Sequence, residues 1–504
     1  MTLDRLICRY GLVILIIFGL IEIVLFTSLP NFAGVVFTII LWIIYSQFCR
    51  NNFARRHFMV YLTLTGYILT QCLALPVTVL YNRPITYGFE SPYLTFLLEV
   101  LTFIIILLGT RFAIRVKINP IRAIIKHFGA YKIPRTEVLW IMGILGVICS
   151  ISNKIASGLP TEFQHFIQGL IVLTYAPYLT IIYTEKLPPP KSLITRLLIY
   201  TIFLISLSFL SNSRQALIKP VLSVILVGFA FFIIESPTYY KQFFKSKFFY
   251  ISFISMIGFA IFANAMSEAI LSNRKYRDDV TAEELARMQY ESLELNKTRE
   301  LKELTTYSEG WVEDYVPNAF FNRYCNLRIQ DECITLIMNN NESMWLYGNN
   351  DMQNDLADRI IRLVPSPFLR LFNVETNKEE SIGSPGDHLY AIFSHTLLKR
   401  SFIITSLTPT LIACFGIFYP IVLFICSFVL FILVDSLNLR KSTGRYALSF
   451  MGFLLTYYFF FFSMSWEIIQ IILFCLRSFL QFSVVILGGF AISKIVFRCI
   501  KQHS

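Results

Sequence analysis

Long runs of apolar residues recur along the whole chain and are separated by short polar connections. A run of about 20 residues is long enough to cross the roughly 30 Å hydrocarbon layer of a membrane as an α-helix. In the first half of the chain this pattern predicts nine spans, near residues 11–29, 32–48, 58–81, 93–112, 137–153, 165–184, 194–211, 215–234 and 249–268. A long polar stretch, residues 269–400, follows before apolar sequence resumes.

The last hundred residues are harder to divide because Pro409 and Pro420 interrupt the apolar stretch 401–435. We expect one span near 410–435, preceded by a segment near 386–408 that lies in the outer interface. Spans near 446–463 and 483–498 follow, and residues 466–485, with Glu467 and Arg477, are expected to form a tilted or interfacial helix. The sequence therefore predicts an all-α, polytopic membrane helix bundle of about 12 spans, within about 11 to 14, with one large, mainly helical loop.

The basic residues predict the orientation of the bundle. Lys and Arg gather in the connections after the second, fourth, sixth and eighth spans, and few follow the odd-numbered spans. Short loops rich in Lys and Arg favour the cytoplasmic side. Both termini are therefore expected in the cytoplasm and the 269–400 loop outside. This gives three units: an N-terminal bundle over 1–268, an extracytoplasmic loop over 269–400, and C-terminal membrane helices over 401–504.

Composition agrees with membrane embedding and limits the partners. The chain is 55% hydrophobic and only 15% charged, with a mean hydropathy of +0.61, whereas a soluble domain carries about a quarter charged residues. A net charge of +12 would suggest nucleic acid as a partner of a soluble protein. Here the basic residues lie beside apolar spans, where anionic headgroups attract them. We expect membrane lipids as partners and no nucleic acid.

Cofactor motifs are not found in the sequence. No CxxC pair or Cys/His cluster suggests a metal site, and no P-loop or dinucleotide-binding glycine motif occurs. Cys325 and Cys333, eight residues apart in the large loop, could form a disulfide outside the cell or remain two free thiols. We expect neither a metal nor a cofactor.

Arginines in outer positions are the first candidate site residues. Arg214 lies between two apolar runs, at the expected outer end of spans seven and eight. Its planar guanidinium suits a phosphate or pyrophosphate, although an arginine there could also snorkel to outer headgroups. Arg323 and Arg328 lie beside aromatic residues in the large loop, which is typical of a substrate surface and equally of a loop helix packed on the membrane.

Histidines and a short outer loop supply the other candidates. His388 and His395 share one face of a predicted helix, and His388 is our first candidate for a general base, with Asp387 beside it. The loop after the third span contains Arg83, Tyr87 and Glu90, a mixture of polar and aromatic residues. Such a mixture could line a sugar-binding cleft or form a plain solvated turn.

Some of these segments resemble a known family. Ser213-Arg214-Gln215 is similar to the Ser-Arg-Gly motif of Wzy-type O-antigen and capsular polysaccharide polymerases, with Gln215 in the place of Gly. Phe321-Asn322-Arg323 is similar to the arginine-bearing segment of their long loop. The His388 region resembles the loop histidine of the related O-antigen ligases, without their His-Asn pair. The span count and the long loop in the C-terminal half resemble this superfamily over nearly the whole chain.

The resemblance implies a metal-independent glycosyltransferase in the bacterial inner membrane. It would polymerise oligosaccharide repeat units carried on polyprenyl pyrophosphate, in the synthesis of O-antigen, capsule or exopolysaccharide. Arg214 and Arg323 would hold the pyrophosphate, His388 would activate the acceptor hydroxyl, and a chain-length regulator and a flippase would be partners. Two alternatives stay open: an O-antigen-type ligase that transfers glycan to a lipid or protein acceptor, and a polysaccharide flippase or other transporter.

Overall fold

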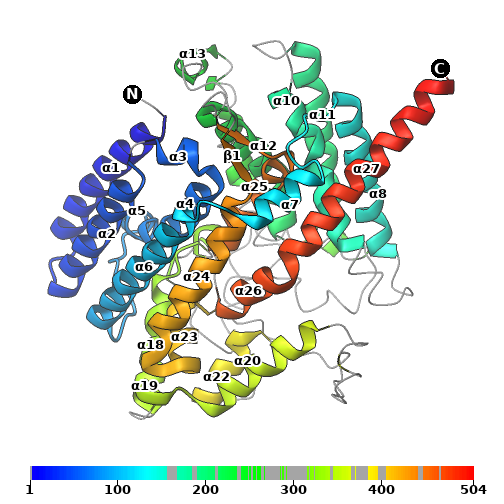
Figure 1. Cartoon of the computed structure of the whole chain (residues 1–504). Helices are drawn as coiled ribbons and strands as arrows, with labels where there is room; N and C mark the ends of the chain where they lie inside the picture. The colour runs from blue at the N-terminus through cyan, green and yellow to red at the C-terminus, as the bar shows by residue number, and fades with distance from the viewer. Residues whose placement is uncertain are drawn as a thin grey trace.

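The computed structural model describes most of the chain. The continuous stretches that it describes are residues 3–50, 52–155, 167–183, 190–209, 214–234, 240–247, 318–322, 324–340, 344–364, 384–394, 405–440, 446–464 and 467–503, with isolated positions between some of them. These residues are almost entirely helical (Figure 1).

The N-terminal half forms the following helices: α1 (Leu3–Leu25), α2 (Leu29–Phe48), α3 (Phe53–Arg56), α4 (Phe58–Cys72), α5 (Ala74–Leu80), α6 (Pro92–Arg115), α7 (Pro120–His127), α8 (Thr136–Ile155), η1 (Ile171–Leu179), α10 (Thr180–Tyr183), α11 (Lys191–Phe209), α12 (Arg214–Ile234) and α13 (Tyr240–Phe244).

The polar stretch and the C-terminal part form α17 (Ala319–Asn322), α18 (Leu327–Asn340), α19 (Met344–Tyr347), α20 (Asn350–Leu363), α22 (Pro385–Ser394), α23 (Leu407–Phe415), η3 (Gly416–Phe418), α24 (Tyr419–Asp435), β1 (Asn438–Arg440), β2 (Tyr446–Leu448), α25 (Phe450–Met464), α26 (Ile468–Leu473), η4 (Phe474–Ser478) and α27 (Phe479–His503).

Several helices have the length and composition of membrane spans. Among the described residues seven qualify: Leu3–Leu25, Leu29–Phe48, Phe58–Leu80, Pro92–Arg115, Lys191–Ser208, Leu407–Asp435 and Ile468–Gln502. Shorter apolar helices cover Thr136–Ile151, Ile167–Tyr183, Ile218–Ile234 and Phe450–Phe461. The chain is thus a mainly helical protein with apolar helices typical of a membrane protein. The total of about twelve spans and the three-unit division stay predictions.

The centre of the bundle is formed by α6 packed along α24 and α4 packed along α25. The α6–α24 approach depends on Gly109, where an added Cβ would lie 2.8 Å from the Cβ of Ser427 and 3.0 Å from the Phe424 carbonyl oxygen. Phe103, Phe431 and Phe453 are fully buried here. This close contact fixes α6, whose first turn carries part of the candidate site.

Two features differ from the expected elements, and one agrees with them. Residues 466–485 and 483–498 were expected as two elements, but α26, η4 and α27 form one continuous helical run, and Arg477 lies in its π-helical turn η4. The expected span near 410–435 is confirmed as one candidate span, interrupted by η3. The all-α prediction missed a small antiparallel pair, β1 and β2, in which Asn438 faces Leu448 and Arg440 faces Tyr446.

The bundle has two distinct ends. Figure 1 shows α18, α19, α20 and α22 gathered at one end, which we call the loop end. The two ends of the chain, α3 and β1 lie at the opposite end, which we call the hairpin end. Which side of a membrane each end faces stays a prediction. The expected ninth span falls largely outside the described residues.

Candidate functional site at the loop end

A short loop between α5 and α6, residues 81–91, carries the first part of the site. Asn82 and Gly88 adopt positive φ values of 54° and 73°, which let the chain turn sharply between the two helices. The buried Ile85 N–H donates to Glu22 Oε1 of α1 at 2.7 Å. The Thr86 hydroxyl donates to the Asn31 side chain of α2. Two buried polar groups of the first helices therefore hold the middle of this loop.

The end of the loop is held by Asp331 of α18. This buried carboxylate accepts from the backbone N–H of Glu90 at 2.6 Å, from that of Ser91 at 3.2 Å and from the Thr95 hydroxyl at 2.8 Å. Ser91 is the N-cap of α6, so the carboxylate lies where backbone N–H groups have no helical partner and the helix dipole is positive. Burial raises the pKa of Asp331, and these three donors oppose the rise. Asp331 thereby ties α18 to the start of α6.

Two arginines meet on the aromatic ring that this loop presents. The Arg83 guanidinium lies 4.5 Å from the centre of the Tyr87 ring, and the Arg328 guanidinium lies 5.8 Å from it. A Cβ on Gly88 would come within 2.8 Å of the Arg328 guanidinium carbon, so only glycine leaves room for this approach. Arg83 also donates to the Tyr315 carbonyl at 3.3 Å. We call Arg83, Tyr87 and Arg328 the arginine platform.

Carboxylates adjoin the arginine platform. Arg328 Nε donates to Glu332 Oε1 at 3.0 Å, and both side chains are largely buried. The second oxygen, Oε2, is buried without a hydrogen-bond partner among the described residues. Burial raises the pKa of Glu332 to about 7, Arg328 opposes the rise, and Asp331 and Glu90 add to it. A guanidinium pair on a partly exposed aromatic ring suits an anionic, hydroxyl-rich ligand.

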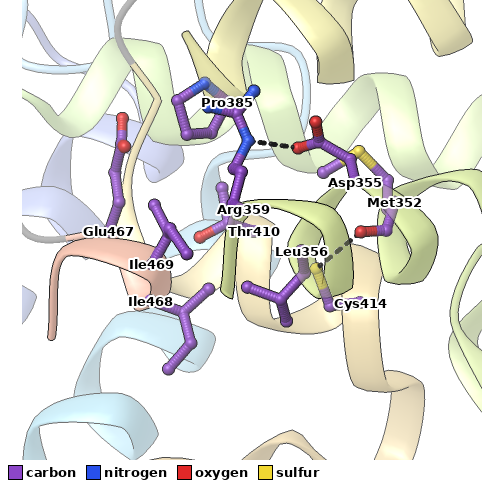
Figure 2. Close-up of a pocket in the computed structure, with 10 residues that line it drawn as sticks. All are labelled: Met352, Asp355, Leu356, Arg359, Pro385, Thr410, Cys414, Glu467, Ile468 and Ile469. Carbon is purple, nitrogen blue, oxygen red and sulfur yellow. Dashed lines mark hydrogen bonds and ion pairs between the residues drawn. The ribbon is translucent and has the colours of Figure 1, made fainter. Parts of the chain in front are cut away.

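A small pocket lies beside α20 at the same end. Figure 2 shows Arg359 between Asp355, which accepts from its Nε at 2.7 Å, and Glu467, the N-cap of α26. The pocket is lined by Met352, Asp355, Leu356, Arg359, Pro385, Thr410, Cys414, Glu467, Ile468 and Ile469, and its free volume is about 10 Å³. That volume holds about one water molecule. The pocket is therefore a junction of helices, too small for a sugar.

The buried Glu467 in this pocket predicts a pH-dependent stability. Burial raises the pKa of Glu467 from its ordinary 4.5 to about 7, while the Thr405 backbone N–H and Arg359 oppose the rise. The folded state then holds this proton more tightly than the unfolded state, so stability is lost as pH rises from about 4.5 to about 7 and stays level above. At about 1.4 kcal/mol per pKa unit this amounts to at most about 3.5 kcal/mol.

Glu467→Gln is therefore expected to unfold at a higher temperature than the wild type at pH 8, and at a similar temperature near pH 4. The amide keeps an acceptor for Thr405 and removes the charge. Thermal unfolding in detergent at several pH values measures this. Glu137→Gln, at an exposed position of α8, is the control that should follow the wild-type curve. Parallel curves for Glu467→Gln and the wild type would contradict the expectation.

His388 lies on α22, which packs against α18 and α20 and begins with Pro385 in the wall of the pocket. The side chain of Asp387, the residue before His388, makes local hydrogen bonds at the start of α22. Its carboxylate accepts from the Ser384 N–H at 2.9 Å, and the Ser384 hydroxyl accepts from the Asp387 N–H at 3.0 Å. This reciprocal pair is a capping box for α22. Asp387 thus fixes the helix that brings His388 to the loop end.

The structure brings together only part of the residues chosen from the sequence. Arg83 and Arg328 meet at Tyr87, and Glu90 is joined to α18 through its backbone. Arg214 is the first residue of α12, with its side chain outside the described residues, and Arg323 and His395 fall outside them too. Cys325 and Cys333 are both buried free thiols. Of the two alternatives, the structure therefore shows two free thiols and not a disulfide.

Sequence reasoning missed an acid inside the bundle. Glu99 of α6 is 1% exposed. It accepts from the Tyr67 hydroxyl of α4 at Oε2, 2.9 Å away, and from the Thr408 hydroxyl of α23 at Oε1. Glu22 of α1 is a second buried acid within a candidate span. The signal was available, because a glutamate inside an apolar run is unusual and needs buried partners.

No group of three or more His, Cys, Asp or Glu side chains that could hold a metal occurs in the parts of the chain that the structure describes. Comparison with family models, with curated proteins and with solved structures finds no match for this chain. Fold and site thus define a mainly helical protein with apolar, membrane-type helices and an arginine, aromatic and carboxylate site at one end.

Proposed function

We propose that this chain is a membrane-embedded glycosyltransferase of the Wzy polymerase type. It would join oligosaccharide repeat units carried on polyprenyl pyrophosphate at the outer face of a bacterial inner membrane. The observation that carries the proposal is the arginine platform, where Arg83 and Arg328 come from distant parts of the chain to one aromatic ring. The loop that carries it is held at its middle and at its end, which supports the fixed geometry that catalysis requires.

The chemistry would be a single displacement. The acceptor hydroxyl oxygen attacks the anomeric carbon of the donor, the bond from that carbon to the pyrophosphate oxygen breaks, and polyprenyl pyrophosphate leaves. His388 is our candidate for the base that takes the hydroxyl proton. The arginines would stabilise the charge that develops on the leaving group. The exposed part of Tyr87 would contact a sugar ring. Configuration at the anomeric carbon would invert.

Arg83→Gln is expected to slow chain extension by about 100-fold, the usual cost of losing one group that stabilises transition-state charge. The test is polymer length and rate with purified protein in liposomes and a polyprenyl-pyrophosphate-linked repeat unit as the only sugar donor. Arg328→Lys should also slow extension, because lysine keeps the charge and loses the planar fork. Arg287→Gln, at an exposed arginine 81% accessible, is the control. Wild-type polymer lengths with Arg83→Gln and Arg328→Lys would refute the assignment.

Transport is the second candidate because two observations favour it. Glu99 is a carboxylate buried inside the bundle, and the span Leu407–Asp435 is broken at η3. Transporters commonly combine intramembrane acids with discontinuous helices. A translocation assay with a fluorescent lipid-linked sugar separates the two. A transporter loses activity with Glu99→Gln and keeps it with Arg83→Gln, whereas a polymerase shows the reverse in chain extension.

A further inference from the structure

The connection between α6 and α8, residues 116–135, has the composition of a membrane-surface segment. It contains Lys117, Arg122, Lys126, Lys132 and Arg135 and not one Asp or Glu. Four of these five side chains are exposed, and Arg122 is half-buried. We call residues 116–135, which include α7, the basic arm.

Large apolar side chains on the basic arm also face outward. Ile118 is 85% exposed, Ile133 71%, Phe128 67% and Ile124 56%. Exposed basic residues lie beside and between them along the chain. Such exposure is costly in water, whereas an interfacial segment buries its apolar side chains at the acyl boundary and leaves its basic ones among the headgroups.

The opposite side of the basic arm is fixed to the bundle. Arg122 donates to Asp435 Oδ2 at 2.7 Å, and the same carboxylate contacts His57 Nδ1 at 2.7 Å. Asn119 donates to the Ile432 carbonyl at 2.9 Å, and the Tyr131 hydroxyl donates to the Ser436 carbonyl at 2.6 Å. These contacts hold the arm to the end of α24, so its outward face is a fixed surface.

We propose that the basic arm binds anionic phospholipids, with Lys117, Lys126 and Lys132 on the phosphate headgroups and Ile118, Ile124, Phe128 and Ile133 at the acyl boundary. The position of the arm supports a lipid over a protein partner. It begins directly after Arg115, where the candidate span Pro92–Arg115 ends, and it leads into the apolar helix Thr136–Ile151. The inference is independent of the proposed enzymatic activity.

Native mass spectrometry of the full-length chain, titrated in neutral detergent with phosphatidylglycerol or phosphatidylcholine, tests this. We expect the wild type to prefer phosphatidylglycerol and to lose the preference as salt rises. Each lysine near a charged surface contributes roughly fivefold to association. The triple variant Lys117→Gln, Lys126→Gln, Lys132→Gln should therefore bind phosphatidylglycerol at least about tenfold more weakly and phosphatidylcholine unchanged.

A matched triple variant at the exposed end of α27, Lys494→Gln, Arg498→Gln, Lys501→Gln, removes the same charge. It should retain affinity for phosphatidylglycerol within about twofold. An equal loss in both triple variants would show that only net charge matters, which would overturn the proposal. Equal affinity of the wild type for the two lipids, at low salt, would also overturn it and point to a protein partner on the arm.

Discussion

Asp331→Ala is expected to lower the free energy of unfolding by about 3 to 5 kcal/mol, as the removal of one partner from a buried charged cluster usually does. The carboxylate accepts from two backbone N–H groups and one hydroxyl. With alanine, these donors at the start of α6 would remain buried without acceptors. The loop that carries Arg83 and Tyr87 would lose its link to α18, so chain extension should fall together with stability.

Thermal unfolding in detergent, followed by intrinsic fluorescence, measures the stability effect. Asp331→Asn keeps one carbonyl acceptor and should lie between Asp331→Ala and the wild type. Asp351→Ala is the matched control, since Asp351 is an exposed acid in the first turn of α20. Its cost should stay below about 1 kcal/mol, the usual value of an acid near a helix start. Similar unfolding temperatures for Asp331→Ala and Asp351→Ala would show that Asp331 does not hold the loop.

Apolar runs were sufficient to predict most helices, because a membrane-type helix must be apolar over nearly its full length. They could not predict the break inside Leu407–Asp435. There the chain turns at Gly416, which has a φ of 51°. The Asn349 N–H donates to the Ala413 carbonyl at 2.7 Å, and Gln353 donates to the Cys414 carbonyl at 2.9 Å. The carbonyls freed by the break thus find partners more than sixty residues away in sequence, which hydropathy cannot show.

The candidate site was predicted in its residue types and only partly in its geometry. Arg83, Tyr87 and Arg328 were each recognisable as polar or aromatic groups in expected outer segments. Their meeting depends on Asp331, Glu22 and Asn31, which hold the 81–91 loop through tertiary contacts. Asp331 has no local signal, because an acid on a polar loop helix is ordinary in sequence. Only its position at the start of α6 gives it a role.

Glu99 has the second large expected effect. Glu99→Ala removes the acceptor of the Tyr67 and Thr408 hydroxyls and leaves a cavity between α4, α6 and α23. We expect a loss of about 3 to 5 kcal/mol in the free energy of unfolding, from the two lost hydrogen bonds and the cavity together. Glu99→Gln keeps the shape and one acceptor and should cost about 1 to 2 kcal/mol. Glu291→Ala, at a side chain 53% exposed, is the control and should leave the unfolding temperature unchanged.

The glutamine variant also separates a structural role for Glu99 from a functional one. A polymerase that acts at the loop end needs Glu99 only to join three helices. Glu99→Gln should therefore extend chains at nearly the wild-type rate. The assay is run below the unfolding temperature of the variant, so that its lower stability does not affect the rate. A transporter that uses the carboxylate would lose translocation with the same variant while remaining folded. Loss of chain extension in folded Glu99→Gln would instead mean that the loop-end site depends on the charge state of the bundle. The arginine platform would then not be sufficient for catalysis.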